Sequence, residues 1–135
     1  MKSLADLEYG KGFHLQGFEF QNGIRPLLNV LPITFICHTR DRDFNYQGEK
    51  TKLQSPTLST RCFDYINGLV DAIGFIIPAN SKNDKPILTF RPSIMAVAGT
   101  RFPQIAREFV LDYKDMASSC AAINAAFIEG AGKEV

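Results

Sequence analysis

The first part of the chain alternates between apolar and polar side chains. Four apolar residues follow at a spacing of two, apart from one slip of phase across Gly17: Phe13, Leu15, Phe18 and Phe20. This spacing is the period of a strand with one buried face, and a glycine at a phase slip is typical of a bulge or bend. The pattern predicts a strand over residues 13–21, closed by a turn at Asn22-Gly23.

Further strands are predicted along the chain, and Pro26 and Pro92 argue for edges or breaks in two of them. They cover residues 24–30, 31–40, 60–66, 86–97 and 102–111. Residues 41–60 are polar and predict either a long mobile loop or an extended hairpin. A short helix is expected near Leu69 to Ile77, and a polar turn over residues 79–84.

The C-terminal part differs in period from the rest. Its apolar residues fall at helical spacing among alanines: Met116, Cys120, Ile123 and Phe127. This spacing predicts an amphipathic helix over residues 114–129 that ends at Gly130.

The expected fold class is mainly β with a C-terminal helix. About five strands, a short helix and a final helix are typical of an OB-like small β-barrel, closed or partly open. A chain of 135 residues is long enough for one domain with its own core. We expect a single domain over residues 1–135, with a lead at 1–12, the barrel at 13–111 and the helix at 114–129.

Composition is that of a globular protein, with 45% hydrophobic and 21% charged residues. The longest apolar runs are too short to span a bilayer, and the N-terminus lacks the order of a signal peptide. A cytoplasmic location without membrane contact is therefore expected. Cys37, Cys62 and Cys120 are expected to be free and mostly buried thiols. The alternative is a zinc site that recruits Cys37, His38 and Cys62.

The net charge of +1 is unevenly distributed. Residues 1–22 carry a balance of −1, residues 23–101 carry +4, and residues 102–135 carry −2. A basic middle between acidic ends is compatible with a surface that faces a polyanion.

Motifs that would indicate catalysis are missing from the sequence. His14 and His38 are the only histidines, and neither lies in an HExxH motif. No GxSxG motif offers a nucleophile, Gly10-Lys11-Gly12 lacks the second half of a phosphate loop, and the carboxylates are scattered singly. We expect a protein that is not an enzyme and that carries no cofactor and no metal.

Basic and aromatic residues gather in the middle of the chain, and this combination holds single-stranded nucleic acid through phosphate contacts and base stacking. The candidate binding residues are His38, Arg40, Arg42, Phe44, Tyr46, Lys50, Lys52, Arg61 and Arg91. Phe44 and Tyr46 lie between charged residues and are the better candidates for stacking.

Each group also has a purely structural interpretation. Arg40 and Arg42 alternate with aspartates, which is compatible with a self-neutralised loop. Phe63 and Tyr65 share one face of the expected strand, either as core or as a stacking platform. Arg91 would either cap an acid or face a ligand.

Four short motifs resemble a poorly characterised family of small proteins carried by integrative and conjugative elements. The motifs comprise Gly17, Phe20, Asn22, Ile24 and Arg25, then Phe35 and Cys37, then Phe63, Asp64 and Gly68, and finally Lys85, Ile87, Leu88, Phe90 and Arg91. Members of that family are described as replication proteins or as similar to single-stranded-DNA-binding proteins. The resemblance covers residues 13–95. It implies an OB-like fold and a role in handling mobile-element DNA, and it assigns no binding residue.

Two hypotheses from different classes follow. In the first, the chain is a homo-oligomer that binds single-stranded DNA, or RNA, with little sequence preference in the replication or transfer of a mobile element. In the second, it is a protein-interaction or assembly subunit that uses the same barrel without touching nucleic acid.

Overall fold

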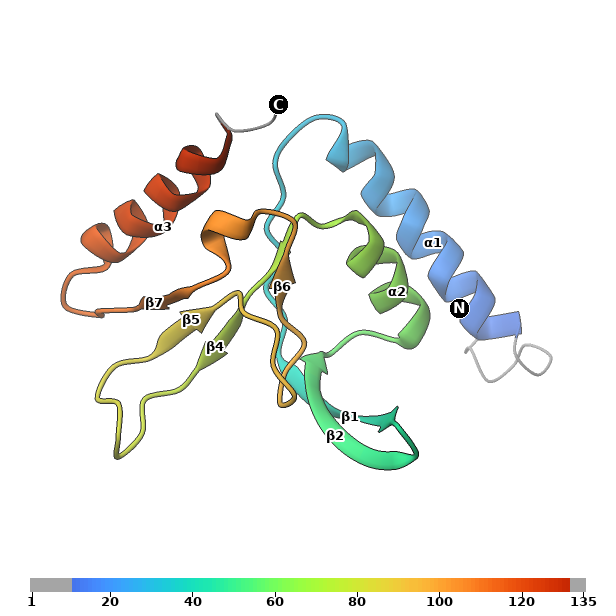
Figure 1. Cartoon of the computed structure of the whole chain (residues 1–135). Coiled ribbons are helices and arrows are strands. Elements are labelled where there is room, and N and C mark those ends of the chain that lie inside the picture. The colour runs from blue at the N-terminus through green and yellow to red at the C-terminus, as the bar shows by residue number, and fades with distance from the viewer. Residues whose placement is uncertain (1–10, 132–135) are drawn as a thin grey trace. The chain divides into compact units, whose positions relative to one another are not determined.

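The structure is a computed structural model, and it describes residues 11–131 (Figure 1). The chain forms two compact units. The helical unit comprises the described residues up to Arg40 together with Pro56–Leu69. The sheet unit comprises Asp41–Ser55 and the described residues from Val70 onward.

The helical unit is built on two helices, α1 (Lys11–Leu28) and α2 (Thr60–Leu69). They run in the same direction, because His14 meets Arg61 near the start of both helices and Phe20 meets Tyr65 further along (Figure 1). The rings of Phe20 and Tyr65 lie edge to face with their centroids 6.5 Å apart. The helices approach closely at Gly17, which is buried.

Helix α1 shows that the predicted strand over residues 13–21, the turn at Asn22-Gly23 and the strand over residues 24–30 are wrong. The sequence carries a second period in the same segment, in which Gly17, Phe20 and Ile24 fall on one side of a helix and are buried or half-buried. Helix α2 contacts this side, so tertiary packing favours the helical period. Pro26 lies in the last turn, where it removes one backbone hydrogen bond, and α1 ends two residues later at Leu28.

Helix α2 likewise occupies residues 60–66, where a strand was predicted. Its buried residues, Cys62 and Ile66, are four positions apart and therefore lie on one face of a helix. The predicted strand over residues 31–40 is present only at its end, where β1 begins at Thr39.

The sheet unit holds the strands in three small sheets (Figure 1). The first sheet is the hairpin of β1 (Thr39–Tyr46) and β2 (Glu49–Pro56), whose terminal residues Thr39, Arg40 and Pro56 belong to the helical unit. The second pairs β3 (Ala72–Ile73) with β6 (Gly99–Thr100). The third is antiparallel in the order β4-β5-β7, with bounds Phe75–Ile77, Ile87–Thr89 and Glu108–Val110.

The core of the sheet unit lies between the three-stranded sheet and the C-terminal helix α3 (Met116–Ala131). Its buried residues are Phe90, Ile105, Phe109 and Ala126. Phe90 makes edge-to-face contacts with Phe109 and with Phe127, at centroid distances of 6.1 and 5.9 Å. Ile105 lies at the end of a short 3-10 helix, η2 (Pro103–Ile105).

The predicted C-terminal helix is confirmed, and Ile123 and Phe127 of its apolar stripe pack on this core. Met116 and Cys120 are exposed instead, and Ala126 is the residue of α3 that is fully buried there. The polar turn over residues 79–84 is also confirmed, with the Asn80 side chain accepting hydrogen bonds from the amides of Lys82 and Asn83.

The strands of the three-stranded sheet and of the β3–β6 pair are antiparallel, as the fold class required, but no closed barrel is found within residues 11–131. Helices also hold more of these residues than strands do, because α1 and α2 replace predicted strands. The short helix expected near Leu69 to Ile77 is wrong, since β3 and β4 lie there. The strands expected over residues 86–97 and 102–111 shorten to β5 and β7, beside Pro92 and Pro103.

Hydrogen bonds to two aspartates fix the start of α3. Asp115 precedes the helix and accepts from the Ser118 amide at 3.2 Å and from the Ser118 hydroxyl at 2.7 Å, as a helix N-cap does. Asp112 pairs with Lys85 at 2.8 Å and accepts from the Lys114 amide at 2.9 Å. The Ser118 hydroxyl lowers the pKa of Asp115, and the hydrogen bond from Lys85 lowers the pKa of Asp112.

We expect replacement of Gly74 by alanine to destabilise the sheet unit. A Cβ atom there would lie 2.8 Å from Leu88 Cδ1 and 3.0 Å from Phe90 Cε1, and Phe90 is held in the core. Such overpacking typically costs about 1–3 kcal/mol. Gly99→Ala is the matched control, because no atom lies within 4 Å of its added Cβ. Urea unfolding measures both variants, and equal stabilities would contradict the close approach.

We also expect the chain to lose stability in acid through Asp112 and Asp115. Both carboxyls have a pKa below the ordinary value of 3.8 when folded. Their contribution is therefore complete above pH 3.8 and is lost as the pH falls through the folded pKa. Thermal unfolding is measured between about pH 2 and pH 6, the range in which carboxyl groups titrate. Asp112→Asn and Asp115→Asn should each lose less thermal stability on acidification than the wild-type chain. Asp43→Asn, which removes an exposed aspartate of β1, is the control.

Candidate functional site

The β1–β2 hairpin turns over two residues with positive φ. Gln47 has φ 51° and Gly48 has φ 87°, the combination that a type I′ turn requires. A two-residue turn of this type places Tyr46 opposite Glu49 and makes the strands antiparallel. The alternative of an extended hairpin over the predicted polar segment is thus the one that the structure adopts.

This register sorts the side chains of the hairpin onto two faces, because neighbouring residues of a strand point to opposite sides. One face, here called the aromatic face, carries Arg42, Phe44 and Tyr46, and Arg40 occupies the next alternate position of β1. The other, here called the mixed face, carries Asp41, Asp43 and Asn45 from β1 with Lys50, Lys52 and Gln54 from β2. Two side-chain contacts agree with this register: Arg42 Nε donates to Ser55 Oγ at 3.2 Å, and the Gln54 amide donates to the Asp41 carboxylate.

The rest of the sheet unit holds the hairpin at its base. The backbone amide of Gln54 donates to the Met95 carbonyl, and the backbone carbonyl of Gln54 accepts from the Val97 amide, both at 2.8 Å. These bonds place β2 beside residues 95–97 in a parallel bridge. Ser55, which binds Arg42, is only 1% exposed. The Arg42 end of the aromatic face is therefore anchored.

The outer end of the aromatic face is open to solvent. The side chains of Phe44 and Tyr46 are 50% and 61% exposed, although both are large and apolar. Exposed aromatics next to arginine on one strand face offer flat surfaces and cationic groups to a ligand.

The other predicted binding residues do not join this face. Lys50 and Lys52 lie on the mixed face. Arg91 is exposed after β5, outside the hairpin segment, and donates from Nε to the Ala106 carbonyl at 3.2 Å. His38 and Arg61 belong to the helical unit, where the His38 carbonyl accepts two hydrogen bonds from Thr57.

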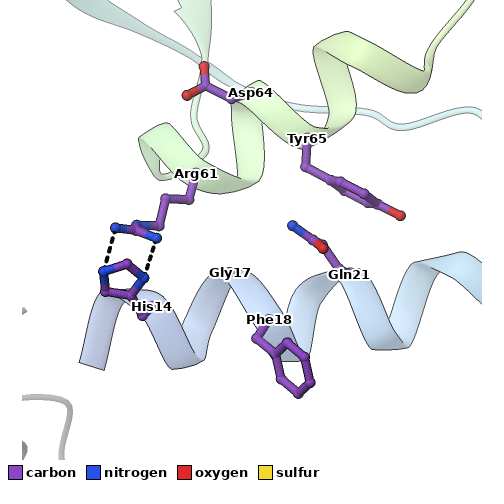
Figure 2. Close-up of a pocket in the computed structure, with 7 residues that line it drawn as sticks. All are labelled: His14, Gly17, Phe18, Gln21, Arg61, Asp64 and Tyr65. Atoms are coloured by element: carbon purple, nitrogen blue, oxygen red, sulfur yellow. Dashed lines mark hydrogen bonds between the residues drawn. The ribbon is translucent and has the colours of Figure 1, made fainter. Parts of the chain in front are cut away.

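The helical unit contains a separate pocket of about 410 Å³ between α1 and α2 (Figure 2). It is lined by His14, Gly17, Phe18 and Gln21 of α1 and by Arg61, Asp64 and Tyr65 of α2. At one end, the guanidinium of Arg61 faces the ring of His14, with Nη1 2.5 Å from Nδ1 and Nη2 2.9 Å from Nε2. At the other end, Gln21 points toward Tyr65 (Figure 2).

Sequence reasoning missed this pocket because its two walls were assigned to strands. The helical spacing of His14, Gly17, Phe18 and Gln21 was a signal that could have found one wall. Tyr65, expected as core or platform, lines the pocket and contacts Phe20.

Cys37, Cys62 and Cys120 are free, as expected, but only Cys62 is buried. Among residues 11–131 no group of three or more His, Cys, Asp or Glu side chains is arranged to hold a metal ion. No helix in this part of the chain is both long enough and apolar enough to cross a membrane.

Comparison of the chain with protein-family models, with curated proteins and with solved structures gave no match in any of the three cases.

Proposed function

We propose that the chain binds single-stranded nucleic acid, with little sequence preference, on the aromatic face of the β1–β2 hairpin. The observation that carries the proposal is the exposure of Phe44 and Tyr46, side by side with Arg42 on that face. The role that the motif resemblance implies, in the replication or transfer of mobile-element DNA, is compatible with this chemistry. The proposal does not require an OB-like barrel, because one hairpin face carries all of its contacts.

Stacking of bases on Phe44 and Tyr46 would explain why these two rings are exposed. Alternate residues of a strand are about 6.8 Å apart along one face, so Phe44 and Tyr46 can each support one base of an extended strand. Every base has a flat π-face, and stacking on an aromatic ring contributes about 1–3 kcal/mol per base without reading sequence. Burying these two rings against bases also removes apolar surface from water.

The arginines of the aromatic face would bind the phosphate groups of the strand. Arg42 places a guanidinium, which carries five N–H groups, on the aromatic face, and its contact with Ser55 is made through Nε. The alternation of arginine and aspartate along β1 is no argument for a self-neutralised segment, because Asp41 and Asp43 point to the mixed face. Asp41 and Asp43 are therefore on the face opposite to Arg42, and the carboxylate on the aromatic face itself is that of Glu49, opposite Tyr46 at the turn.

A second candidate function, protein assembly, is favoured by one observation on α1. Phe13, Leu15 and Phe18 are 64%, 47% and 60% exposed, which is unusual for large apolar residues on one helix. An assembly subunit would self-associate through this helix and would show no salt-sensitive affinity for a polyanion.

We expect Phe44→Ala and Tyr46→Ala each to weaken binding of a single strand about 5-fold to 150-fold, which is the stacking contribution of one base. Fluorescence anisotropy with a labelled oligonucleotide of about 30 nucleotides, several times the site of one small domain, measures the affinity. Tyr113→Ala is the matched control, because Tyr113 is 74% exposed and lies outside the hairpin. Equal affinities for all three variants, or no binding by the wild-type chain at low salt, would remove the proposal.

We expect the loss of affinity on removing two positive charges to depend on which face of the hairpin carried them. Arg40→Ala combined with Arg42→Ala should weaken binding and reduce the slope of log affinity against log salt by about 0.7 for each phosphate that is no longer neutralised. Lys50→Ala combined with Lys52→Ala removes the same charge from the mixed face and should change both quantities less. Anisotropy at two salt concentrations tests this, with circular dichroism to check that the Arg42 variant keeps its fold. Identical effects of the two pairs would contradict binding on one face.

A further inference from the structure

We propose that Glu49 selects the base that stacks on Tyr46, favouring a base with an exocyclic amino group, such as cytosine, over thymine or uracil. This inference rests on the proposed binding of single-stranded nucleic acid. It adds a preference at one base to a face that otherwise stacks any base. Both residues are exposed at the end of the hairpin where the turn lies.

The turn places Glu49 beside Tyr46. The two-residue turn at Gln47-Gly48 sets these residues opposite each other, and the side chains of such a pair leave the ribbon on the same face. Their Cβ atoms are then on the order of 5 Å apart. A base that lies on the Tyr46 ring can therefore bring its edge within reach of the Glu49 carboxylate.

The Glu49 carboxylate is set apart from the cations of the hairpin. Lys50 and Lys52 point to the mixed face. Arg42 is on the same face as Glu49 but two alternate positions further along the ribbon, roughly 14 Å away. Among the residues that the structure describes, no hydrogen bond or ion pair is found for the Glu49 side chain. A carboxylate in this position can accept hydrogen bonds from a ligand.

The separation of the two charges orients a bound strand. Phosphates are attracted to Arg42 at the anchored end of the aromatic face and are repelled by Glu49 at the turn. Near the turn, the sugar-phosphate backbone should therefore lie on the side of Tyr46 that is away from Glu49. The sugar and the Watson–Crick edge of a pyrimidine are on opposite sides of its ring. A pyrimidine stacked on Tyr46 would thus direct this edge toward Glu49.

Cytosine and uracil differ at the atom that the carboxylate would meet. Cytosine carries the N4 amino group, a donor from which Glu and Asp side chains accept in nucleic-acid recognition. Uracil and thymine carry the carbonyl oxygen O4 there, an acceptor that a carboxylate repels. Thr51, which is opposite Phe44, offers a hydroxyl that donates as well as accepts. The base on Phe44 is therefore not selected in this way.

Fluorescence anisotropy of the full chain with two labelled oligonucleotides of about 30 nucleotides, one of deoxycytidine and one of deoxyuridine, tests the inference. The two bases share one ring and differ at this edge. At slightly alkaline pH, where cytosine is not protonated, we expect the deoxycytidine strand to bind about 2-fold to 12-fold more tightly, the contribution of one hydrogen bond. Equal affinities would overturn this inference and leave the proposed function intact, whereas no binding of either strand would overturn both.

Glu49→Gln assigns the preference to the carboxylate. A glutamine amide both donates and accepts, so this variant should bind the two strands with equal affinity. Asp43→Asn removes a carboxylate from the mixed face of the same hairpin and should keep the preference, as the matched control. A preference that survives in Glu49→Gln would overturn the assignment. An equal gain in affinity for both strands would do so too, because it indicates only a general charge effect.

Two aromatic variants locate the selected base. Tyr46→Ala should lose the preference together with the stacking at that position. Phe44→Ala should bind both strands more weakly and keep the preference, because the base beside Glu49 is still stacked. Circular dichroism establishes that each variant is folded. Loss of the preference in Phe44→Ala but not in Tyr46→Ala would contradict a selective position at the turn.

Discussion

The two-residue turn at Gln47-Gly48 is the constraint on which the chemistry of the hairpin depends. Because it fixes Tyr46 opposite Glu49, every residue of β1 and β2 is assigned to one of two faces. A shift of one residue would place Phe44 and Tyr46 on the same side of the ribbon as the lysines. The positive φ of 87° at Gly48 is a conformation that other residues adopt with strain.

The same register bears on self-association. No strand pairs with the outer edge of β1 in the part of the chain that the structure describes. Tyr46 directs its backbone groups toward β2, so by alternation the odd-numbered residues direct theirs outward. Two β1 edges in antiparallel pairing would thus set odd-numbered residues opposite odd-numbered ones. Wherever residues 40–43 met their copy, arginine would oppose arginine and aspartate would oppose aspartate, which is destabilising. Antiparallel pairing of two β1 edges in this register is therefore disfavoured.

Sequence reasoning succeeded where one period dominates and failed where two compete. The alanine-rich segment around Ile123 and Phe127 has only a helical period, and it is a helix. Around Gly17 the alternation of phenylalanines competes with a helical spacing, and only contact with a segment 47 residues away decides between them. For α2, the four-residue spacing of Cys62 and Ile66 was a usable signal. Exposure of Phe44 and Tyr46 could be predicted from their charged neighbours, but their separation from Lys50 and Lys52 depends on the turn.

The hairpin is hydrogen-bonded to the sheet unit at the Gln54 end and exposed to solvent at the turn. This difference bears on how a ligand would bind along it. An isolated two-stranded ribbon is marginally stable in water, so the backbone bonds of Gln54 to Met95 and Val97 are what hold it. Arg42 lies at this anchored end, where its contact with Ser55 limits its freedom before any ligand arrives. Phe44 and Tyr46 lie toward the turn, where the strands have support only from each other. If the chain binds nucleic acid as proposed, ordering a phosphate contact would therefore cost less than ordering the stacked bases, and binding would begin at Arg42 and extend toward the turn.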